Sequence, residues 1–182
     1  MTEKAVLPKA GNDPLEIARA YAAGPGPNGN DFDFFVGEWE AKVVRYAPDG
    51  SVLLEHEAHW SAQSLFDGRM IEDRFVPRTG DGEIGAVITL RTYCVDSEQW
   101  EMVFLWAQQP IPSLVNFVGN RIDGEMILTG DHAGPEGQAI RSRICFFEIT
   151  SDSFSWEHGV SVDGSETWHV HTAMDVRRQV TT

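Results

Sequence analysis

Apolar and polar residues alternate along most of the chain from residue 37 onward, with the period of two that a half-buried strand requires. In the first such segment, the side chains facing one side are apolar: Trp39, Ala41 and Val43. The side chains between them are all charged: Glu38, Glu40 and Lys42. The segment opens with a glycine, Gly37, which lets the backbone come close to the large apolar anchor Trp39.

About ten segments of this kind follow one another, separated by turn sequences such as Pro48-Asp49-Gly50 and Asp123-Gly124. This short, regular spacing is typical of a meandering antiparallel barrel. We therefore expect an all-β fold, an antiparallel barrel of about eight to ten strands, over residues 31–182.

Residues 1–30 are expected to form a separate N-terminal part, made of a loose arm, a short helix and a linker. Asp13-Pro14 is a typical helix start, and the helix is expected over residues 14–22. The Gly/Pro-rich segment 24–30 then ends it. Such a helix could cap the barrel mouth, lie on a partner subunit, or pack on the barrel wall.

Several short motifs occur in a fixed order along the chain: Phe32-Asp33-Phe34, Gly37-x-Trp39, Thr89-Leu90-Arg91, Gln99-Trp100, Ser155-Trp156-Glu157-His158, Ser161 to Trp168, Met174-Asp175 and Arg177. This ordered set resembles an uncharacterised bacterial lipocalin-like family with a calycin-type barrel. The resemblance covers about residues 32–178. It implies a barrel with an internal cavity, and it implies no particular substrate.

The strand expected over residues 52–62 has one apolar face, which places His56 and Trp60 inside the barrel and His59 outside. The next strand, residues 69–76, has no clean apolar face. Glu72 lies on one side of it and Asp73 on the other, so one carboxylate must face inward. Because a buried acid is costly unless it is paired, this inward group needs a partner or a purpose.

His158 lies on the apolar face of its strand together with Trp156. A neutral histidine in an apolar cavity can accept or donate a proton near physiological pH. The alternative is a structural histidine that is bonded to a neighbouring carbonyl. The candidate catalytic residues are therefore His158, with Glu72 or Asp73 as its partner, and His56.

Large side chains on the inward faces are the candidate walls of a ligand site: Trp39, Trp60, Phe104, Trp106 and Trp156. Of the tryptophans, Trp39, Trp60, Trp106, Trp156 and Trp168 are expected to be mostly buried. Arg91 and Tyr93 lie at a strand end and could orient a carbonyl or carboxylate group of a ligand. For Arg91, an outer-face cation is the simpler interpretation. The polar loop at residues 108–112 is a plausible barrel mouth.

His169-Val170-His171 raises the question of a metal site, as does the pair Glu57 and His59, because residues two apart share a strand face. The residues between the two histidines continue an apolar face, so both histidines are expected to point outward. No metal and no cofactor are therefore expected. A haem group held by His158 is the alternative.

The chain has 14 basic and 28 acidic residues, which give a net charge of -14. This balance disfavours nucleic acid and anionic membrane surfaces as partners. No apolar run is long enough to span a membrane, and the N-terminus has no apolar leader. Cys94 and Cys145 each lie in an apolar strand and are expected to be buried free thiols of a cytoplasmic protein.

The first functional hypothesis is a cofactor-independent acid–base enzyme of isomerase, lyase, dehydratase or cyclase type. Its substrate would be a hydrophobic, aromatic or polyketide-like small molecule held in the barrel. The alternative is a carrier or sensor of lipocalin type that uses the same cavity without turnover. The second alternative is the haem-binding barrel. A homodimer is possible in each case.

Overall fold

A computed structural model of the chain describes residues 13–26, 28–107, 115–134 and 137–179. In this part of the chain, all strands belong to one antiparallel sheet. The strands are β1 (Gly37–Tyr46), β2 (Val52–Leu65), β3 (Met70–Thr79), β4 (Gly82–Glu83), β5 (Val87–Cys94), β6 (Gln99–Trp106), β7 (Val115–Ile122), β8 (Glu125–Ala133), β9 (Ala139–Phe147), β10 (Ser153–Ser161) and β11 (His169–Arg178). The segments expected at residues 1–12 and 108–112 fall outside the described residues.

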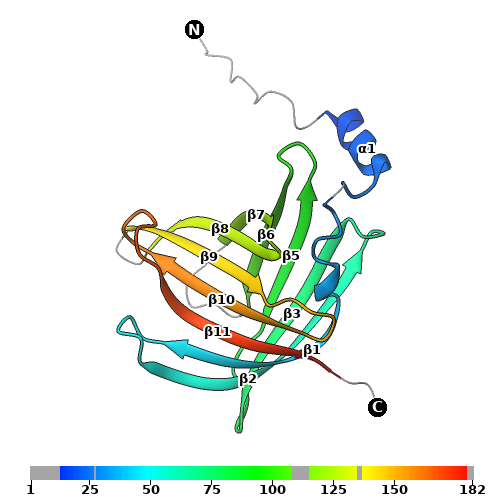
Figure 1. Cartoon of the computed structure of the whole chain (residues 1–182). Helices are drawn as coiled ribbons and strands as arrows, with labels where there is room; N and C mark the ends of the chain where they lie inside the picture. The colour runs from blue at the N-terminus through cyan, green and yellow to red at the C-terminus, as the bar shows by residue number, and fades with distance from the viewer. Residues whose placement is uncertain (1–12, 27, 108–114, 135–136, 180–182) are drawn as a thin grey trace.

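The sheet closes on itself as a barrel (Figure 1). Strands β5 to β11 each pair with the next along the chain; β11 pairs with β1, β1 with β2, and β2 with β3. The last link joins β3 to β5, and the two-residue strand β4 pairs only with β3. The expected all-β antiparallel barrel is therefore confirmed. Because closure leaves no long unpaired edge, the interior is enclosed by strands.

One end of the barrel is filled by the chain segment that leads into β1. This segment contains the 3-10 turn η1 (Asp33–Phe35), and the side chains of Phe32 and Phe35 are completely buried. Phe32 packs edge-on against Trp100 with ring centroids 4.9 Å apart, and Phe35 packs against Trp60 at the same distance. We call this the closed end of the barrel. Aromatic packing there leaves the remaining interior space toward the other end.

The Gly37-x-Trp39 motif is held to the end of β11 by Arg178. The guanidinium of Arg178 stacks on the Trp39 ring at 4.0 Å and donates hydrogen bonds to the carbonyls of Phe34, Val36 and Ser151. Gly37 has φ 139°, and a Cβ atom there would lie 2.2 Å from an Arg178 nitrogen. The glycine is thus required both by its backbone conformation and by the close approach of this arginine.

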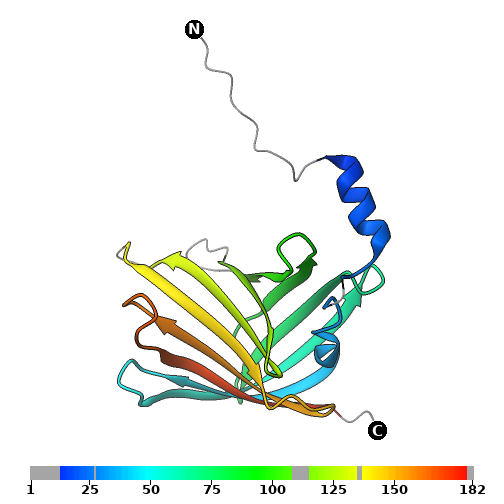
Figure 2. The ribbon, with the colours of Figure 1, turned by 45° about the horizontal axis from the view of Figure 1, so that its top comes forward.

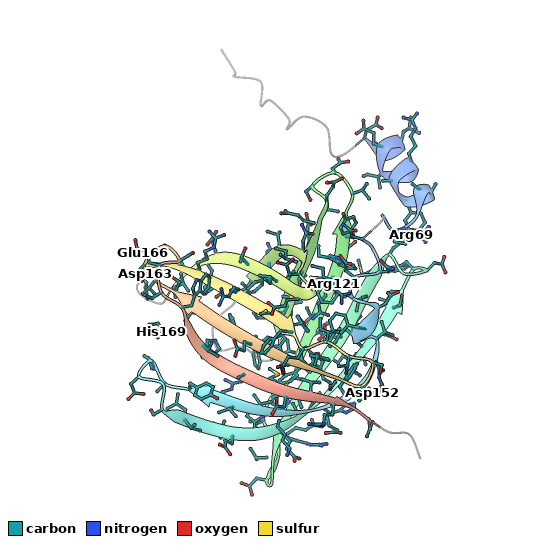
Figure 3. All side chains as sticks on the ribbon, viewed as in Figure 1. Arg69, Arg121, Asp152, Asp163, Glu166 and His169 are labelled. Atoms are coloured by element: carbon teal, nitrogen blue, oxygen red, sulfur yellow. The ribbon has the colours of Figure 1, made fainter. Side chains whose placement is uncertain are left out.

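The expected helix is present as α1 (Pro14–Ala23), and its N-terminus is capped by Asp13, whose carboxylate accepts from the Leu15 amide at 2.9 Å. No residue of α1 is buried. Figures 1 and 2 show the helix standing outside the barrel. It is joined to the barrel through Arg69, labelled in Figure 3, which stacks on the Tyr21 ring at 4.4 Å. The helix therefore does not pack broadly on the barrel wall.

The inward faces follow the alternation read from the sequence. Trp39 and Trp60 are buried and Trp106, Trp156 and Trp168 are partly buried, so none of the five tryptophans is largely exposed. Cys94 and Cys145 are free thiols, but both are half-buried rather than buried. In the described part of the chain, no helix is long and apolar enough to span a membrane.

Candidate functional site

The barrel interior contains a cavity of about 300 Å³. Its walls are mostly apolar and come from eight strands: β1, β2, β3, β5, β6, β9, β10 and β11. The principal wall residues are Val43, Phe75, Val87, Phe104, Trp106 and Trp156. Two broader hollows, one lined by residues of β1, β2, β9, β10 and β11 and one beside α1, are more open to solvent. The interior cavity is therefore the place where a small molecule would be removed from water.

A buried ion pair forms the floor of the cavity, next to the closed end. Arg91 is 2% exposed and Asp73 is 1% exposed, and the Arg91 guanidinium donates to the Asp73 carboxylate. The other carboxylate oxygen accepts a hydrogen bond from the Trp60 indole at 2.6 Å. Burial raises the pKa of Asp73, and the charge of Arg91 and the Trp60 hydrogen bond oppose that rise. The pairing with Arg91 offsets the free-energy cost of burying the inward-facing carboxylate of Asp73.

Arg91 also packs among aromatic rings of the closed end. Its guanidinium lies 4.7 Å from the Phe35 ring centroid and 5.0 Å from that of Phe32. The sequence interpretation of Arg91 as an outer-face cation is therefore wrong. The physical reason is that Arg91 shares the inward face of β5 with Thr89, which pairs across the sheet with Asp73.

Histidines gather at the opposite end of the cavity. The His158 and His171 rings lie with their centroids 4.4 Å apart, and both line the cavity together with Arg45. The Nε2 atom of His158 is buried, and no hydrogen-bond partner for it exists among the described residues. We call this the histidine end, defined by Arg45, His158 and His171.

The expectation that His169 and His171 both point outward is wrong for His171. The register between β10 and β11 shifts after His158, which pairs with Thr172, while Gly159 pairs with Val170. His171 is thus an extra residue in a β-bulge, a device that re-aims a side chain. His169 lies before the bulge and is exposed, as Figure 3 shows at the start of β11.

His158 is uncharged at neutral pH. Burial lowers its pKa to about 3, and the neighbouring His171 and His132 act in the same direction. Burial also lowers the pKa of His171, with a further lowering from the charge of Arg45. A neutral imidazole in a cavity wall has one ring nitrogen that donates and one that accepts, so it can offer either kind of hydrogen bond to a ligand, depending on its tautomer.

The depressed pKa predicts an acid-sensitive fold. In the unfolded chain, His158 has a pKa near 6.5 and takes up a proton that the folded protein does not accept. Stability therefore falls as the pH drops from about 6.5 toward 3, and this one group should remove about 2 kcal/mol between pH 7.5 and pH 5. Urea denaturation at both pH values measures the loss.

The variant His158→Phe should lose about 2 kcal/mol less than the wild type over this pH interval. The control for the loss of a histidine outside the cavity is His169→Gln, at an exposed position on the next strand. Equal losses in the wild type and His158→Phe would contradict the burial of a neutral imidazole at this position.

Most of the residues predicted for the ligand site do line the cavity: Trp60, Asp73, Arg91, Phe104, Trp106, Trp156 and His158. Trp39 and Tyr93 do not, because both lie toward the closed end. Trp39 packs against Phe154, and Tyr93 packs against Trp100 at 5.8 Å. The side chains of these two residues face inward, but they lie at the closed end of the barrel rather than beside the cavity.

His56 and Glu72 also lie away from the cavity. His56 faces inward and is buried, but its Nδ1 donates to the Glu57 carbonyl at 2.9 Å, and it is not among the cavity-lining residues. Glu72 lies on the outer face of β3, where it pairs with Arg74 at 2.8 Å. Asp73 is thus the inward carboxylate, and among the described residues it bonds to Arg91, Trp60 and Thr89 rather than to His158.

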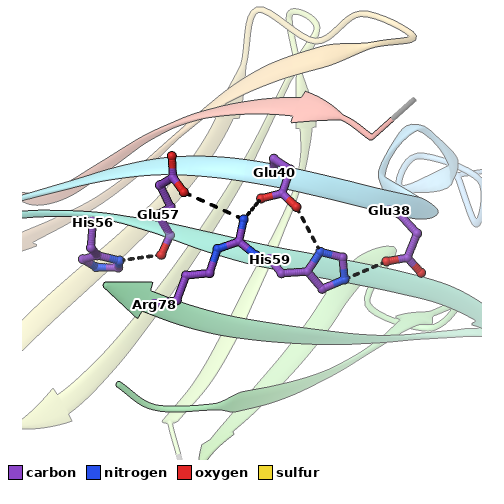
Figure 4. A network of polar contacts seen from close by, with 6 residues as sticks. All are labelled: Glu38, Glu40, His56, Glu57, His59 and Arg78. Atoms are coloured by element: carbon purple, nitrogen blue, oxygen red, sulfur yellow. Dashed lines mark hydrogen bonds and ion pairs between the residues drawn. The ribbon is translucent and has the colours of Figure 1, made fainter. Parts of the chain in front are cut away.

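The outer face near β1 carries a network of charges that includes the pair Glu57 and His59 (Figure 4). His59 points outward as expected and lies 2.9 Å from Glu38. Arg78 lies 2.5 Å from Glu40 and 3.8 Å from Glu57. Within residues 13–26, 28–107, 115–134 and 137–179, no group of three or more His, Cys, Asp or Glu side chains is arranged to hold a metal ion.

Comparison with known proteins supports the fold. No family model and no curated protein matches the chain. Among solved structures, Rv2717c from M. tuberculosis is similar with a TM-score of 0.62 and 16% identity, covering 86% of this chain and 99% of that one. The S-type phycobiliprotein lyase CPES from Guillardia theta is similar with a TM-score of 0.53 and 13% identity, covering 84% and 93%.

At these identities the likeness concerns the fold alone. The closed antiparallel barrel and the two similar structures fit a lipocalin-like, calycin-type architecture. Membership in the bacterial lipocalin-like family that the sequence motifs resemble stays a prediction.

Proposed function

We propose that this protein binds a small, mostly apolar molecule inside the barrel, with the neutral imidazole of His158 as a hydrogen-bonding group. The observation that carries the proposal is the interior cavity, whose mostly apolar walls include His158, a histidine whose buried Nε2 atom has no partner among the described residues. Apolar walls with a few convergent polar groups are the usual composition of a ligand pocket.

The size of the cavity narrows the class of ligand. Its volume of about 300 Å³ lies at the lower end of the range of about 300–1,000 Å³ for small-molecule sites. Two tryptophans, Trp106 and Trp156, together with Phe104 supply flat aromatic walls. A compact aromatic molecule of one or two rings fits these walls better than a long chain.

Binding receives more support than acid–base turnover. A general base works best with a pKa near the working pH, and His158 has a pKa lowered to about 3. The inward carboxylate of Asp73 is bonded to Arg91 at the other end of the cavity. The pair of groups that an isomerase or lyase of the expected kind needs is therefore not assembled among the described residues, which favours the carrier or sensor hypothesis.

Haem binding is the second candidate, and one observation favours it. His158 lines an aromatic cavity and is uncharged, and the neutral imidazole is the form of histidine that ligates iron. The small cavity counts against a porphyrin lying entirely inside. Titration with haemin decides between the two, because ligation should sharpen and shift the Soret band of haemin, and this change should be lost in His158→Ala.

A cavity-filling substitution tests the proposed function. Val87 lines the cavity and is 8% exposed, so Val87→Phe places a ring in the ligand space. With 2-naphthol as the probe, binding followed by quenching of tryptophan fluorescence should weaken by at least about tenfold, or 1.4 kcal/mol. The control is Val118→Phe, at a 41% exposed position on β7, which should bind as the wild type does. Equal affinity in Val87→Phe and the wild type would place the probe elsewhere.

A further inference from the structure

Arg45 brings a cationic side chain to the histidine end of the cavity. It continues the inward face of β1 after Trp39, Ala41 and Val43, and it pairs across the sheet with Thr172 of β11. Its guanidinium lies 6.0 Å from the Trp106 ring centroid. Its charge therefore faces the cavity rather than the outer surface.

Arg45 has no counter-charge within the described part of the chain. No carboxylate there lies within 4.0 Å of its guanidinium, and its buried Nε atom has no hydrogen-bond partner. The chain has 28 acidic residues against 14 basic ones, so carboxylates are abundant elsewhere on the molecule. A partly buried cation without a partner is costly, which indicates a place for an anion that the protein itself does not supply.

The charges of the residues that line the cavity also favour an anionic ligand. Among the described residues, the wall carries Arg45 and Arg91 but only one carboxylate, Asp73. Because Asp73 is paired with Arg91, it does not neutralise the positive charge of Arg45 at the other end of the cavity. The cavity is thus positive inside a protein whose net charge is -14. Negatively charged ligands gain from this field, and cations lose.

From these contacts we infer that the ligand is an organic anion, in which a carboxylate on a compact apolar body is held by Arg45 at the histidine end of the cavity. This inference rests on the proposed function of the cavity and names its ligand class. A planar carboxylate matches the fork of N–H groups on a guanidinium, and hydrogen bonds to charged groups are stronger than neutral ones. The aromatic walls receive the rest of the molecule.

The experiment compares two probes of the same shape, 2-naphthoate and its neutral isostere 2-naphthamide, by isothermal titration calorimetry. The wild type should bind 2-naphthoate at least about tenfold more tightly than 2-naphthamide. In Arg45→Gln, the affinity for 2-naphthoate should fall by about tenfold or more, while that for 2-naphthamide changes by less than about twofold. The control Lys42→Gln removes the same charge from the exposed outer face of β1 and should keep the preference.

The outcomes separate the inference from the proposed function. If the wild type binds both probes equally and Arg45→Gln changes neither, the anion preference is wrong while ligand binding in the cavity stands. If neither probe binds the wild type at millimolar concentration, the proposed function is contradicted and the anion preference with it. Urea denaturation of Arg45→Gln establishes that the variant is folded, and Arg45→Lys, which keeps the charge, should retain part of the preference.

Discussion

Replacing Asp73 with alanine should lower the free energy of unfolding by about 3–5 kcal/mol. The variant leaves the guanidinium of Arg91, which is 2% exposed, without its counter-charge. It also removes the acceptor of the hydrogen bond from the Trp60 indole. The cost comes from the uncompensated buried cation and the unpaired donor, more than from the lost attraction itself.

Urea denaturation of the neighbouring variant Glu72→Ala provides a matched control. Glu72 is one residue away but pairs with Arg74 on the outer face, where the Arg74 side chain is 62% exposed, so its loss should cost less than about 1 kcal/mol. The double variant Asp73→Ala/Arg91→Met should recover much of the stability, because an apolar pair needs no counter-charge. A single variant Asp73→Ala as stable as Glu72→Ala would contradict the role of the floor ion pair.

The alternation of side chains predicted which residues face inward, and it did so from a purely local property. A strand has a period of two whatever surrounds it, so the inward positions of His56, Trp60 and His158 follow from the pattern alone. Inward-facing positions recur every two residues along β1, so the inward position after Val43 is Arg45. The inward position of Arg45 could therefore have been predicted from the sequence. A charged residue after three apolar ones, however, usually indicates that the apolar face of the strand has ended.

Height along the barrel could not be predicted in the same way. Trp39 and Arg45 lie on one face of one strand, yet the first belongs to the closed end and the second to the cavity. What divides them is the segment around Phe32 and Phe35, which folds into the barrel and fills one end. This division depends on contacts between residues far apart in the sequence, and no local period encodes it.

The inward position of His171 could not be predicted because a bulge changes the period itself. Neighbouring residues of a regular strand face opposite sides, so His171, next to the inward-facing Thr172, is expected to point outward. Only the pairing with β10 reveals that one residue is inserted there. Bulges occur often near functional sites, where they re-aim a side chain. The bulge at His171 puts a second histidine beside His158 at the end of the cavity that also contains Arg45.

Replacing Trp39 with alanine is expected to cost about 3–5 kcal/mol of unfolding free energy, because a fully buried tryptophan is truncated. Its side chain is 0% exposed and packs on Phe154 with ring centroids 5.0 Å apart. Its indole donates to the Phe35 carbonyl at 2.7 Å, which ties β1 to the segment that fills the closed end. The variant also removes the ring on which Arg178 stacks.

The matched control is Trp168→Ala, since Trp168 is only partly buried and stacks under Arg143 at 4.5 Å. It should cost less than half as much as Trp39→Ala in the same urea titration. Because Trp39 does not line the cavity, the folded fraction of Trp39→Ala should still bind 2-naphthol with the affinity of the wild type. Equal destabilisation by the two substitutions would mean that the closed end does not hold the barrel together through Trp39.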